Sequence, residues 1–228
     1  AHNLYVIEDN AQAIGATYSL GDGSAVKAGT MGHLGTTSFF PSKNLGCYGD
    51  GGGLFTNDDD LARTVRGIVN HGMYKRYYHD VIGVNSRLDT LQAAVLSAKL
   101  PFLDDYNRRR REAAAKYDNA FKDRPGIITP VQVGNAGSHV YHQYTLRITN
   151  GKRDALAAYL SENKIPYGIY YPVPLHRQEA YKDDRYNEAD FPVTNRLVNE
   201  VISLPMHTEL DEEQIHYITS KIIAFLSD

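Results

Sequence analysis

A short apolar run near the start of the chain, ending in two carboxylates, constrains the fold most. The run is Leu4-Tyr-Val-Ile7, and Glu8 and Asp9 follow it directly. Continuous apolar runs of this length are typical of a parallel strand buried on both faces. Side chains at the carboxyl ends of such strands often meet ligands. The run therefore predicts an α/β fold with Asp9 at the carboxyl edge of a sheet.

Two further strand-like segments surround a lysine. Residues 36–40 are rich in Thr and Phe, Pro41 stops them, and Lys43 follows; residues 51–56 form a third run. Five glycines follow the lysine, and the last three begin the third run: Gly46, Gly49, Gly51, Gly52 and Gly53. They precede a strand, so they are not a phosphate-binding loop, which opens a helix. A tight turn is the simplest interpretation, but glycines also let a ligand approach the backbone closely.

Each of these residues has an ordinary alternative role. A carboxylate at a strand end, such as Asp9, is often a helix cap or a surface charge, and most lysines are solvated. It is their combination within one short stretch that favours a site.

Helical periodicity and capping residues mark the remaining elements. Residues 57–59 offer an N-cap to a helix that ends before Gly72, and a longer helix is expected from about Ser86 through Phe121 with a break at Pro101. A smaller lobe follows, with strands over 141–148 and 165–171, a helix over 152–163, and a last helix opening at Asp211-Glu-Glu-Gln214. We expect domains over residues 1–122 and 123–228.

Charge and composition exclude several classes of protein. The net charge is -3, with 24 basic and 27 acidic residues, so a nucleic-acid partner is not expected. The run Arg108–Arg111 is interpreted as a solvated helix surface with local acidic partners. A single cysteine, Cys47, and the absence of metal-ligand spacing among nine histidines argue against a metal site. No apolar run is long enough for a membrane span, and a cytoplasmic location is expected.

Long motifs in the same order as in a known family now identify a resemblance. They are Val6-Ile-Glu-Asp-Asn-Ala-Gln-Ala-Ile-Gly15, Gly35-Thr-Thr-Ser-Phe-Phe-Pro-Ser-Lys-Asn-Leu-Gly-Cys-Tyr-Gly-Asp-Gly-Gly53 and Asn85-Ser-Arg-Leu-Asp-Thr-Leu-Gln-Ala-Ala94. The chain resembles the pyridoxal-phosphate-dependent sugar aminotransferases of the DegT family. The resemblance implies an aspartate-aminotransferase-like fold (fold type I), of which this chain would hold the C-terminal part of the large mixed-sheet domain and a small α/β C-terminal domain. It also implies a homodimer with a shared active site.

The resemblance assigns cofactor-binding roles to five residues. Lys43 matches the lysine that binds the cofactor aldehyde, and Asp9 matches the carboxylate that keeps the pyridine nitrogen protonated. Gln12 matches the partner of the ring hydroxyl region, Ser38 a phosphate-binding serine, and Asn85 the phosphate ligand supplied to the other subunit. Taken alone, Gln12 would be a helix-surface residue, Ser38 a strand serine, and Asn85 a helix cap.

Four residues are expected to bind substrate. They are Arg87, Tyr170, Tyr171 and His176; the last three belong to Tyr170-Tyr-Pro-Val-Pro-Leu-His176, whose aromatic rings could stack on a sugar or base. Arg87 could instead pair with Asp89 or Asp9, and Tyr171 could simply be a packed strand exit.

The expected reaction is transfer of an amino group from glutamate to a keto sugar of a nucleotide sugar. The motifs most resemble enzymes that act on UDP-linked 2-acetamido-3-keto sugars, including the 3-oxo-glucuronate derivative, in surface polysaccharide or lipopolysaccharide biosynthesis. One alternative is a nucleotide-sugar dehydratase on the same fold, which Lys43 disfavours because a histidine replaces this lysine there; another is a non-catalytic regulator. Family members carry further residues before the strand ending in Asp9, so we expect an incomplete sheet and an open cofactor site.

Overall fold

The computed structural model describes residues 2–135 and 137–227, and its contacts divide the chain into two compact units. The first unit comprises Ala1–Arg108 and Gln132–His142, and the second comprises Arg109–Val131 and Gln143–Asp228. The expected domain boundary after residue 122 stays a prediction.

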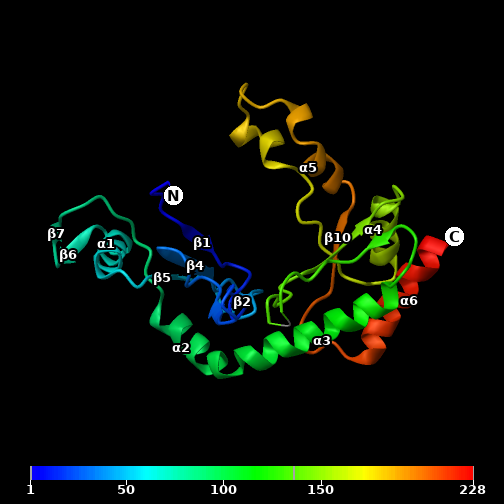
Figure 1. Ribbon diagram of the computed structural model, residues 1–228, viewed down its shortest axis with the longest axis horizontal. Helices are drawn as coiled ribbons and strands as arrows, with labels where there is room; N and C mark the ends of the chain where they lie inside the picture. Colours follow the sequence, from blue (N-terminus) through cyan, green and yellow to red (C-terminus); the bar gives the residue numbers. More distant parts are fainter. Residues whose placement is uncertain (1, 136, 228) are drawn as a thin grey trace. The chain divides into compact units, whose positions relative to one another are not determined.

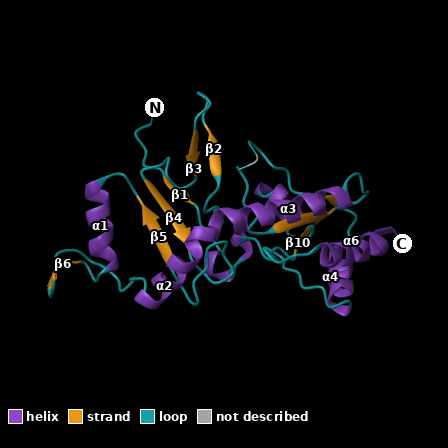
Figure 2. Ribbon diagram, turned by 90° about the horizontal axis from the view of Figure 1, so that it is seen from below, coloured by secondary structure: helices purple, strands orange, loops and turns teal. Residues whose placement is uncertain are grey.

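The first unit holds a three-stranded mixed sheet in the order β1 (Ile7–Asp9), β4 (Leu34–Ser38) and β5 (Gly52–Phe55) (Figure 2). β1 runs parallel to β4, as expected, and β5 runs antiparallel to it. The expected burial of the first strand is wrong. β1 pairs only with β4 among the described strands, and the side chains from Leu4 through Ile7 are between 51% and 81% exposed.

Short hairpins and helices complete the first unit. They are β2 (Thr17–Ser19), β3 (Ala25–Lys27), α1 (Asp59–Val69), β6 (Met73–Lys75), β7 (Tyr78–His79), α2 (Thr90–Lys99), the 3-10 turn η1 (Leu100–Phe102) and the first residues of α3 (Leu103–Phe121). The predicted cap of α1 is confirmed: the Asp58 carboxylate accepts N–H groups of Asp60 and Leu61 at 2.9 and 3.0 Å.

The long helix begins later than expected. Its break at Pro101 is confirmed by η1, but α2 begins at Thr90 instead of near Ser86. Residues before it are engaged elsewhere: Asn85 forms a β-bridge with Asn70, and the Ser86 N–H donates to the Val69 carbonyl at 2.9 Å. The segment at Asn85 is therefore paired as a bridge with the end of α1, and the helix begins only after it.

A small apolar core lies around the turn that carries Lys43. Its buried members are Leu45, Cys47, Leu96 and Leu103, and Ile14 and Phe39 pack against them. The core therefore joins the loops after β1 and β4 to helices α2 and α3.

The second unit is built on an antiparallel sheet in the order β10 (Val201–Leu204), β9 (Tyr144–Ile148) and β8 (Ile127–Ile128). The helices α4 (Arg153–Glu162) and α6 (Glu212–Ser227) pack on each other (Figure 1). The smaller elements are η2 (Leu175–Arg177), η3 (Glu179–Tyr181), η4 (Glu188–Asp190) and α5 (Pro192–Leu197). The expected strand over 165–171 is wrong, since only Gly168 forms a bridge there, to Ser203.

Alternating burial fixes the core of this unit. In β9 the buried side chains are Tyr144, Leu146 and Ile148, as the period of two for a strand requires. The Tyr144 ring lies 4.9 Å from that of Tyr117 on α3, and both rings are fully buried. The hydroxyl of Tyr117 donates to the Pro205 carbonyl at 3.0 Å.

The predicted cap of α6 is confirmed, whereas the predicted exposure of the whole arginine run is wrong. Asp211 and Gln214 cap α6 reciprocally, through bonds of 2.7 and 3.1 Å. Arg110 is not part of a solvated surface: it is buried and donates to the Met206 carbonyl at 3.0 Å, and desolvation lowers its pKa. None of the helices described is both long and apolar enough to cross a lipid bilayer.

Candidate active site

Asp9 and Ser38 lie at one edge of the first-unit sheet. In the parallel register, Asp9 stands opposite Thr36, and Ser38 follows Thr36 by two residues at the end of β4. Because side chains alternate between faces, paired residues and those two apart share a face of the sheet. Asp9 and Ser38 therefore lie on the same face at the carboxyl edge.

Local hydrogen bonds shape the loops that leave this edge. The Asp9 carboxylate accepts the Ala11 N–H at 3.0 Å, and the Ser38 hydroxyl accepts the Phe40 N–H at 3.3 Å. Both are short side-chain-to-backbone turns of the kind that Asp and Ser favour. Asp9 is exposed and Ser38 half-buried, so both can meet a ligand.

Lys43 lies in the turn directly after β4. Its N–H donates to the Phe40 carbonyl at 2.8 Å, and its side chain is half-buried. Within the described part of the chain, its ammonium group makes no hydrogen bond or ion pair. The turn folds back sharply at Gly46, where a Cβ would lie 2.4 Å from the Pro41 carbonyl oxygen. Lys99 of α2 donates to the Gly46 carbonyl and fixes this fold.

Glu8 precedes Asp9 on β1 and stabilises the loop that packs beside this strand. Its carboxylate accepts the N–H groups of Gly29, Met31 and Gly32 at 2.8, 2.5 and 2.5 Å. Desolvation raises the pKa of Glu8, but these three donors outweigh it and hold the pKa below its ordinary value. Glu8 was not foreseen from the sequence; its position on the opposite side of the strand from Asp9 was the available signal.

Gln12 lies in the turn over residues 11–15 and is exposed. This segment makes turn bonds, such as that from the Ala13 N–H to the Asn10 carbonyl at 3.2 Å, and does not form a helix. Gln12 thus follows Asp9 on the loop that leaves the sheet edge.

Asn85 and Arg87 both contact Asn70. The backbone of Asn85 forms a β-bridge with that of Asn70, and the Arg87 guanidinium donates to the Asn70 side-chain oxygen at 3.3 Å. The alternatives in which Arg87 pairs with Asp89 or Asp9, or Asn85 caps the long helix, are not what the structure shows. Across the described residues, no hydrogen bond or ion pair links this pair to Asp9, Ser38 or Lys43.

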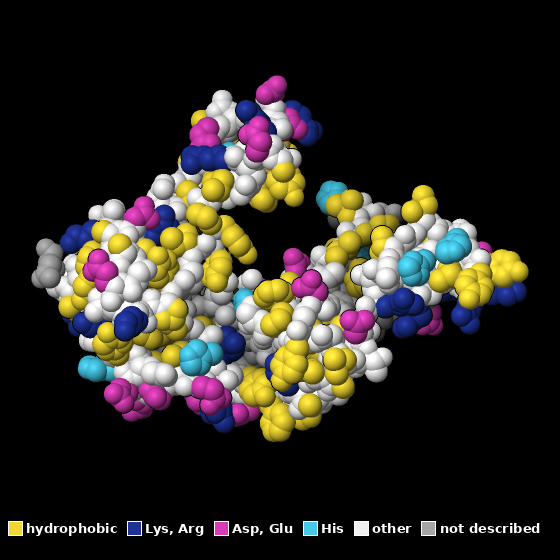
Figure 3. Space-filling model, turned by 180° about the vertical axis from the view of Figure 1, so that it is seen from behind, with side chains coloured by type: hydrophobic (Ala, Val, Ile, Leu, Met, Phe, Trp, Pro, Cys, Tyr) yellow, Lys and Arg dark blue, Asp and Glu magenta, His cyan; other side chains and the backbone are white. Residues whose placement is uncertain are grey.

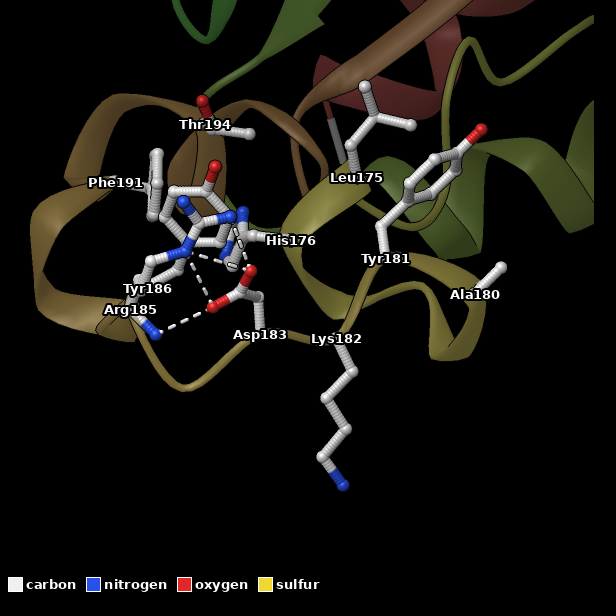
Figure 4. A pocket seen from close by; sticks show the side chains of 10 residues that line it. All are labelled: Leu175, His176, Ala180, Tyr181, Lys182, Asp183, Arg185, Tyr186, Phe191 and Thr194. Carbon is white, nitrogen blue, oxygen red and sulfur yellow. Dashed lines mark hydrogen bonds and ion pairs between the residues drawn. The ribbon is translucent and has the colours of Figure 1, made fainter.

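In the second unit, His176 lines a pocket of about 720 Å³. The lining residues are Leu175, His176, Ala180, Tyr181, Lys182, Asp183, Arg185, Tyr186, Phe191 and Thr194 (Figure 4). Tyr170 and Tyr171 do not line it; their rings lie 5.6 Å apart and remain exposed. The aromatic and charged residues that recur between Tyr181 and Phe191 were the available sequence signal for this pocket.

The imidazole of His176 is held on two sides. Its Nε2 lies 3.0 Å from a carboxylate oxygen of Glu188, and its ring stacks on Phe191 at 4.3 Å. Arg177 also donates to Glu188. The Arg177 hydrogen bond is the largest cause that lowers the pKa of Glu188 to about 2; desolvation opposes it, and the His176 bond lowers the pKa further. On the pocket wall, Arg185 is paired with Asp183 (Figure 4).

Comparison with known proteins identifies one family that matches nearly the whole chain. The model of the DegT/DnrJ/EryC1/StrS aminotransferase family matches residues 1–223. Similar curated proteins include the "Pleiotropic regulatory protein" of Geobacillus stearothermophilus, 48% identical over 98% of this chain and 59% of its own length. Another is the UDP-2-acetamido-2-deoxy-3-oxo-D-glucuronate aminotransferase of Pseudomonas aeruginosa, 43% identical over 97% of this chain and 58% of its own length.

Solved structures agree. A DegT/DnrJ/EryC1/StrS aminotransferase from Brucella abortus has a TM-score of 0.86 at 42% identity, covering 99% of this chain and 58% of that one. DesV of S. venezuelae has a TM-score of 0.90 at 36% identity, covering 100% of this chain and 59% of that one. The chain spans about three fifths of the length of these proteins.

Proposed function

The chain belongs to the DegT/DnrJ/EryC1/StrS aminotransferase family, and from this we propose that it carries the cofactor-binding part of a nucleotide-sugar aminotransferase that uses pyridoxal phosphate. One observation supports the proposal most: Asp9 and Ser38 share a face of the sheet at one edge, and Lys43 lies in the turn that leaves it.

The chemistry of these donors fits the cofactor. Pyridoxal phosphate presents a basic ring nitrogen, an aldehyde and a phosphate, which call for a carboxylate, an amine and a hydrogen-bond donor. Asp9, Lys43 and Ser38 supply one of each. At Gly52 a Cβ would lie 2.9 Å from the Thr37 carbonyl oxygen, so the backbone next to Ser38 stays uncovered by a side chain.

Each residue of the proposed site would have its own role toward the cofactor. When bound, pyridoxal phosphate supplies an electron sink for the electrons released at the substrate carbon. The Asp9 carboxylate would hold a proton on the ring nitrogen. The Lys43 amine would anchor the aldehyde carbon and move a proton at the substrate carbon, while the Ser38 hydroxyl would donate to a phosphate oxygen. Gln12, on the loop after Asp9, would contact the ring hydroxyl region.

We further propose a homodimer in which Asn85 of a second copy completes the phosphate site. Support comes from the segment around it, where large apolar side chains are exposed: Tyr77, Tyr78, Ile82, Val84, Leu91 and Phe102. Figure 3 shows hydrophobic side chains at the surface of the face that it draws. Exposed large apolar side chains that gather in a patch are typical of an interface.

For substrate we propose a UDP-linked 2-acetamido-3-keto sugar with glutamate as amino donor, in a cytoplasmic step of surface polysaccharide biosynthesis. The named activity of the P. aeruginosa relative supports this sugar. Arg87, Tyr170, Tyr171 and His176 would contact it, and the rings around His176 offer flat faces for a sugar or base.

Trapping the cofactor on Lys43 tests the proposal. Purified protein is incubated with pyridoxal phosphate and reduced with borohydride, and its peptides are weighed. We expect the added mass on the peptide with Lys43 and none after Lys43→Ala, with Lys27→Ala as a control. Glutamate and a panel of UDP- and dTDP-keto sugars should then yield 2-oxoglutarate. A deoxy sugar product instead would favour the dehydratase, and no label at Lys43 would contradict the assignment.

A regulatory role is the second candidate, because the relative with 48% identity bears the name of a regulatory protein. A gel shift with DNA at physiological salt separates the two. We expect no shift, since the chain is slightly acidic; a specific shift without any label at Lys43 would favour the regulator.

A further inference from the structure

Two buried asparagines join three loops of the first unit. Asn44 is 6% and Asn107 is 1% exposed. The Asn44 amide donates to the side-chain oxygen of Asn107 at 2.7 Å and to the Val140 carbonyl at 2.9 Å. The Asn107 amide in turn donates to the Ile14 carbonyl at 3.0 Å.

Two of the segments that this pair joins belong to the candidate site. Asn44 follows Lys43 directly, and Ile14 lies on the loop that leaves Asp9 and carries Gln12. Val140 belongs to the segment after α3, and Asn107 lies on α3. One side chain, that of Asn107, thus links the turn of Lys43 to the loop of Asp9.

An amide suits this link because it can accept one hydrogen bond and donate another at the same time. Asn107 accepts through its oxygen and donates through its nitrogen, whereas a carboxylate cannot donate and an apolar side chain can do neither. The neighbouring backbone leaves room for it: a Cβ at Gly15 would lie 2.5 Å from the Asn107 nitrogen.

Stability alone does not account for the pair. The oxygen of Asn44 is buried and has no hydrogen-bond partner among the described residues. A buried acceptor without a partner is unfavourable and needs an explanation, and a role in a functional site is one such explanation. The ammonium of Lys43 has no partner there either, so the backbone at residues 43 and 44 determines where the amine starts.

We propose that Asn107, acting through Asn44, is a positioning residue that holds the backbone of Lys43 in register with the loop of Asp9. This inference rests on the proposed function. Loss of the link lets the amine of Lys43 and the carboxylate of Asp9 shift independently, and small misplacements of reacting groups slow catalysis strongly.

Asn107→Leu tests the inference, because leucine has a similar size and forms neither bond. The matched control is Asn163→Leu, which removes an amide that donates to the Tyr159 carbonyl at 2.9 Å in the second unit. Three quantities are measured on each purified protein: the pH midpoint of borohydride-trapped label on Lys43, kcat and KM for amino transfer, and the thermal midpoint.

We expect Asn107→Leu to displace the pH midpoint and to lower kcat about 10- to 100-fold while KM for the keto sugar is unchanged. Asn163→Leu should keep the wild-type pH midpoint and kcat. A folded Asn107→Leu protein that loses only thermal stability, with both quantities as in the wild type, would overturn the inference. If the leucine variant does not fold, Asn107→Ser, which cannot span both partners, is measured against the same criteria.

The two proposals fail in different ways. If wild-type protein takes no label on Lys43, the proposed function is wrong and this inference is wrong with it. If the wild type is labelled and the folded Asn107 variant matches it in pH midpoint and kcat, only the positioning role is wrong.

Discussion

Asp9 stands opposite Thr36 in the parallel register of β1 and β4. This one pairing brings Asp9 level with the end of β4, so that Ser38 follows on the same face and Lys43 lies in the next turn. Residues about 30 positions apart in sequence thereby meet at one sheet edge, and the proposed cofactor site follows from it.

Replacing Asp9 by Asn should separate charge from structure. Asn keeps an oxygen to accept the Ala11 N–H but cannot hold a proton on a ring nitrogen, so we expect kcat to fall about 100-fold or more with an unchanged thermal midpoint. Asp22→Asn is the matched control, because Asp22 accepts the Ser24 N–H in the same way at 2.9 Å. Equal kcat for Asp9→Asn and wild type would exclude a catalytic role for the Asp9 charge.

The charge of Glu8 should stabilise the first unit in a pH-dependent way. Its pKa is lowered in the folded state, so its contribution is present above the ordinary value of 4.5 and is lost as pH falls through the folded pKa. We expect Glu8→Gln to lower the free energy of unfolding by about 1 kcal/mol at pH 7, and the difference to shrink below pH 4.5. Urea unfolding at several pH values measures this, with exposed Glu179→Gln as control. A difference independent of pH would show that the charge does not matter.

Glu188 should act on substrate binding through His176. Glu188→Gln removes the negative charge that holds both His176 and Arg177, so we expect KM for the keto sugar to rise about tenfold with kcat nearly unchanged. Because the pKa of Glu188 is about 2, this contact should persist down to acidic pH in the wild type. Asp184→Asn in the same segment should have no effect on KM. An unchanged KM for Glu188→Gln would show that the pocket lined by His176 does not bind the substrate.

Tyr117→Phe should destabilise the second unit without affecting chemistry. The hydroxyl is buried and its loss leaves the Pro205 carbonyl without that donor, so we expect a drop of about 1 to 2 kcal/mol in the free energy of unfolding. Tyr217→Phe is the control, because that hydroxyl bonds to the Asn163 carbonyl at 3.1 Å from an exposed ring and should matter less. Equal effects of the two changes would argue against a role for burial.

Local features of the fold could be predicted because their partners lie close in sequence. The caps of α1 and α6 at Asp58 and Asp211 bond to N–H groups two or three residues away, and Pro101 interrupts its own helix. The strands that end at Asp9 and Ser38 were predicted only in part, since the expected runs over 4–7 and 36–40 overlap β1 (Ile7–Asp9) and β4 (Leu34–Ser38) without matching their bounds.

Features that depend on distant partners were mispredicted. Arg110 looked solvated beside its charged neighbours, but its partner is the Met206 carbonyl, 96 residues away. Asn85, taken alone, looked like a helix cap, but its backbone forms a β-bridge with Asn70 at the end of α1. Helix and strand periodicity carry no information on such contacts.

The order of residues along the chain specifies which chemical groups the site can offer: a carboxylate after a strand, a lysine after a proline, and a serine between them. How these groups are assembled depends on contacts between distant parts of the fold. The parallel register of β1 and β4 sets Asp9 level with Thr36, and the bond between Asn44 and Asn107 spans 63 residues. The reason is physical, since register and buried hydrogen bonds are selected by the packing of the whole unit, whereas caps and turns are satisfied within a few residues.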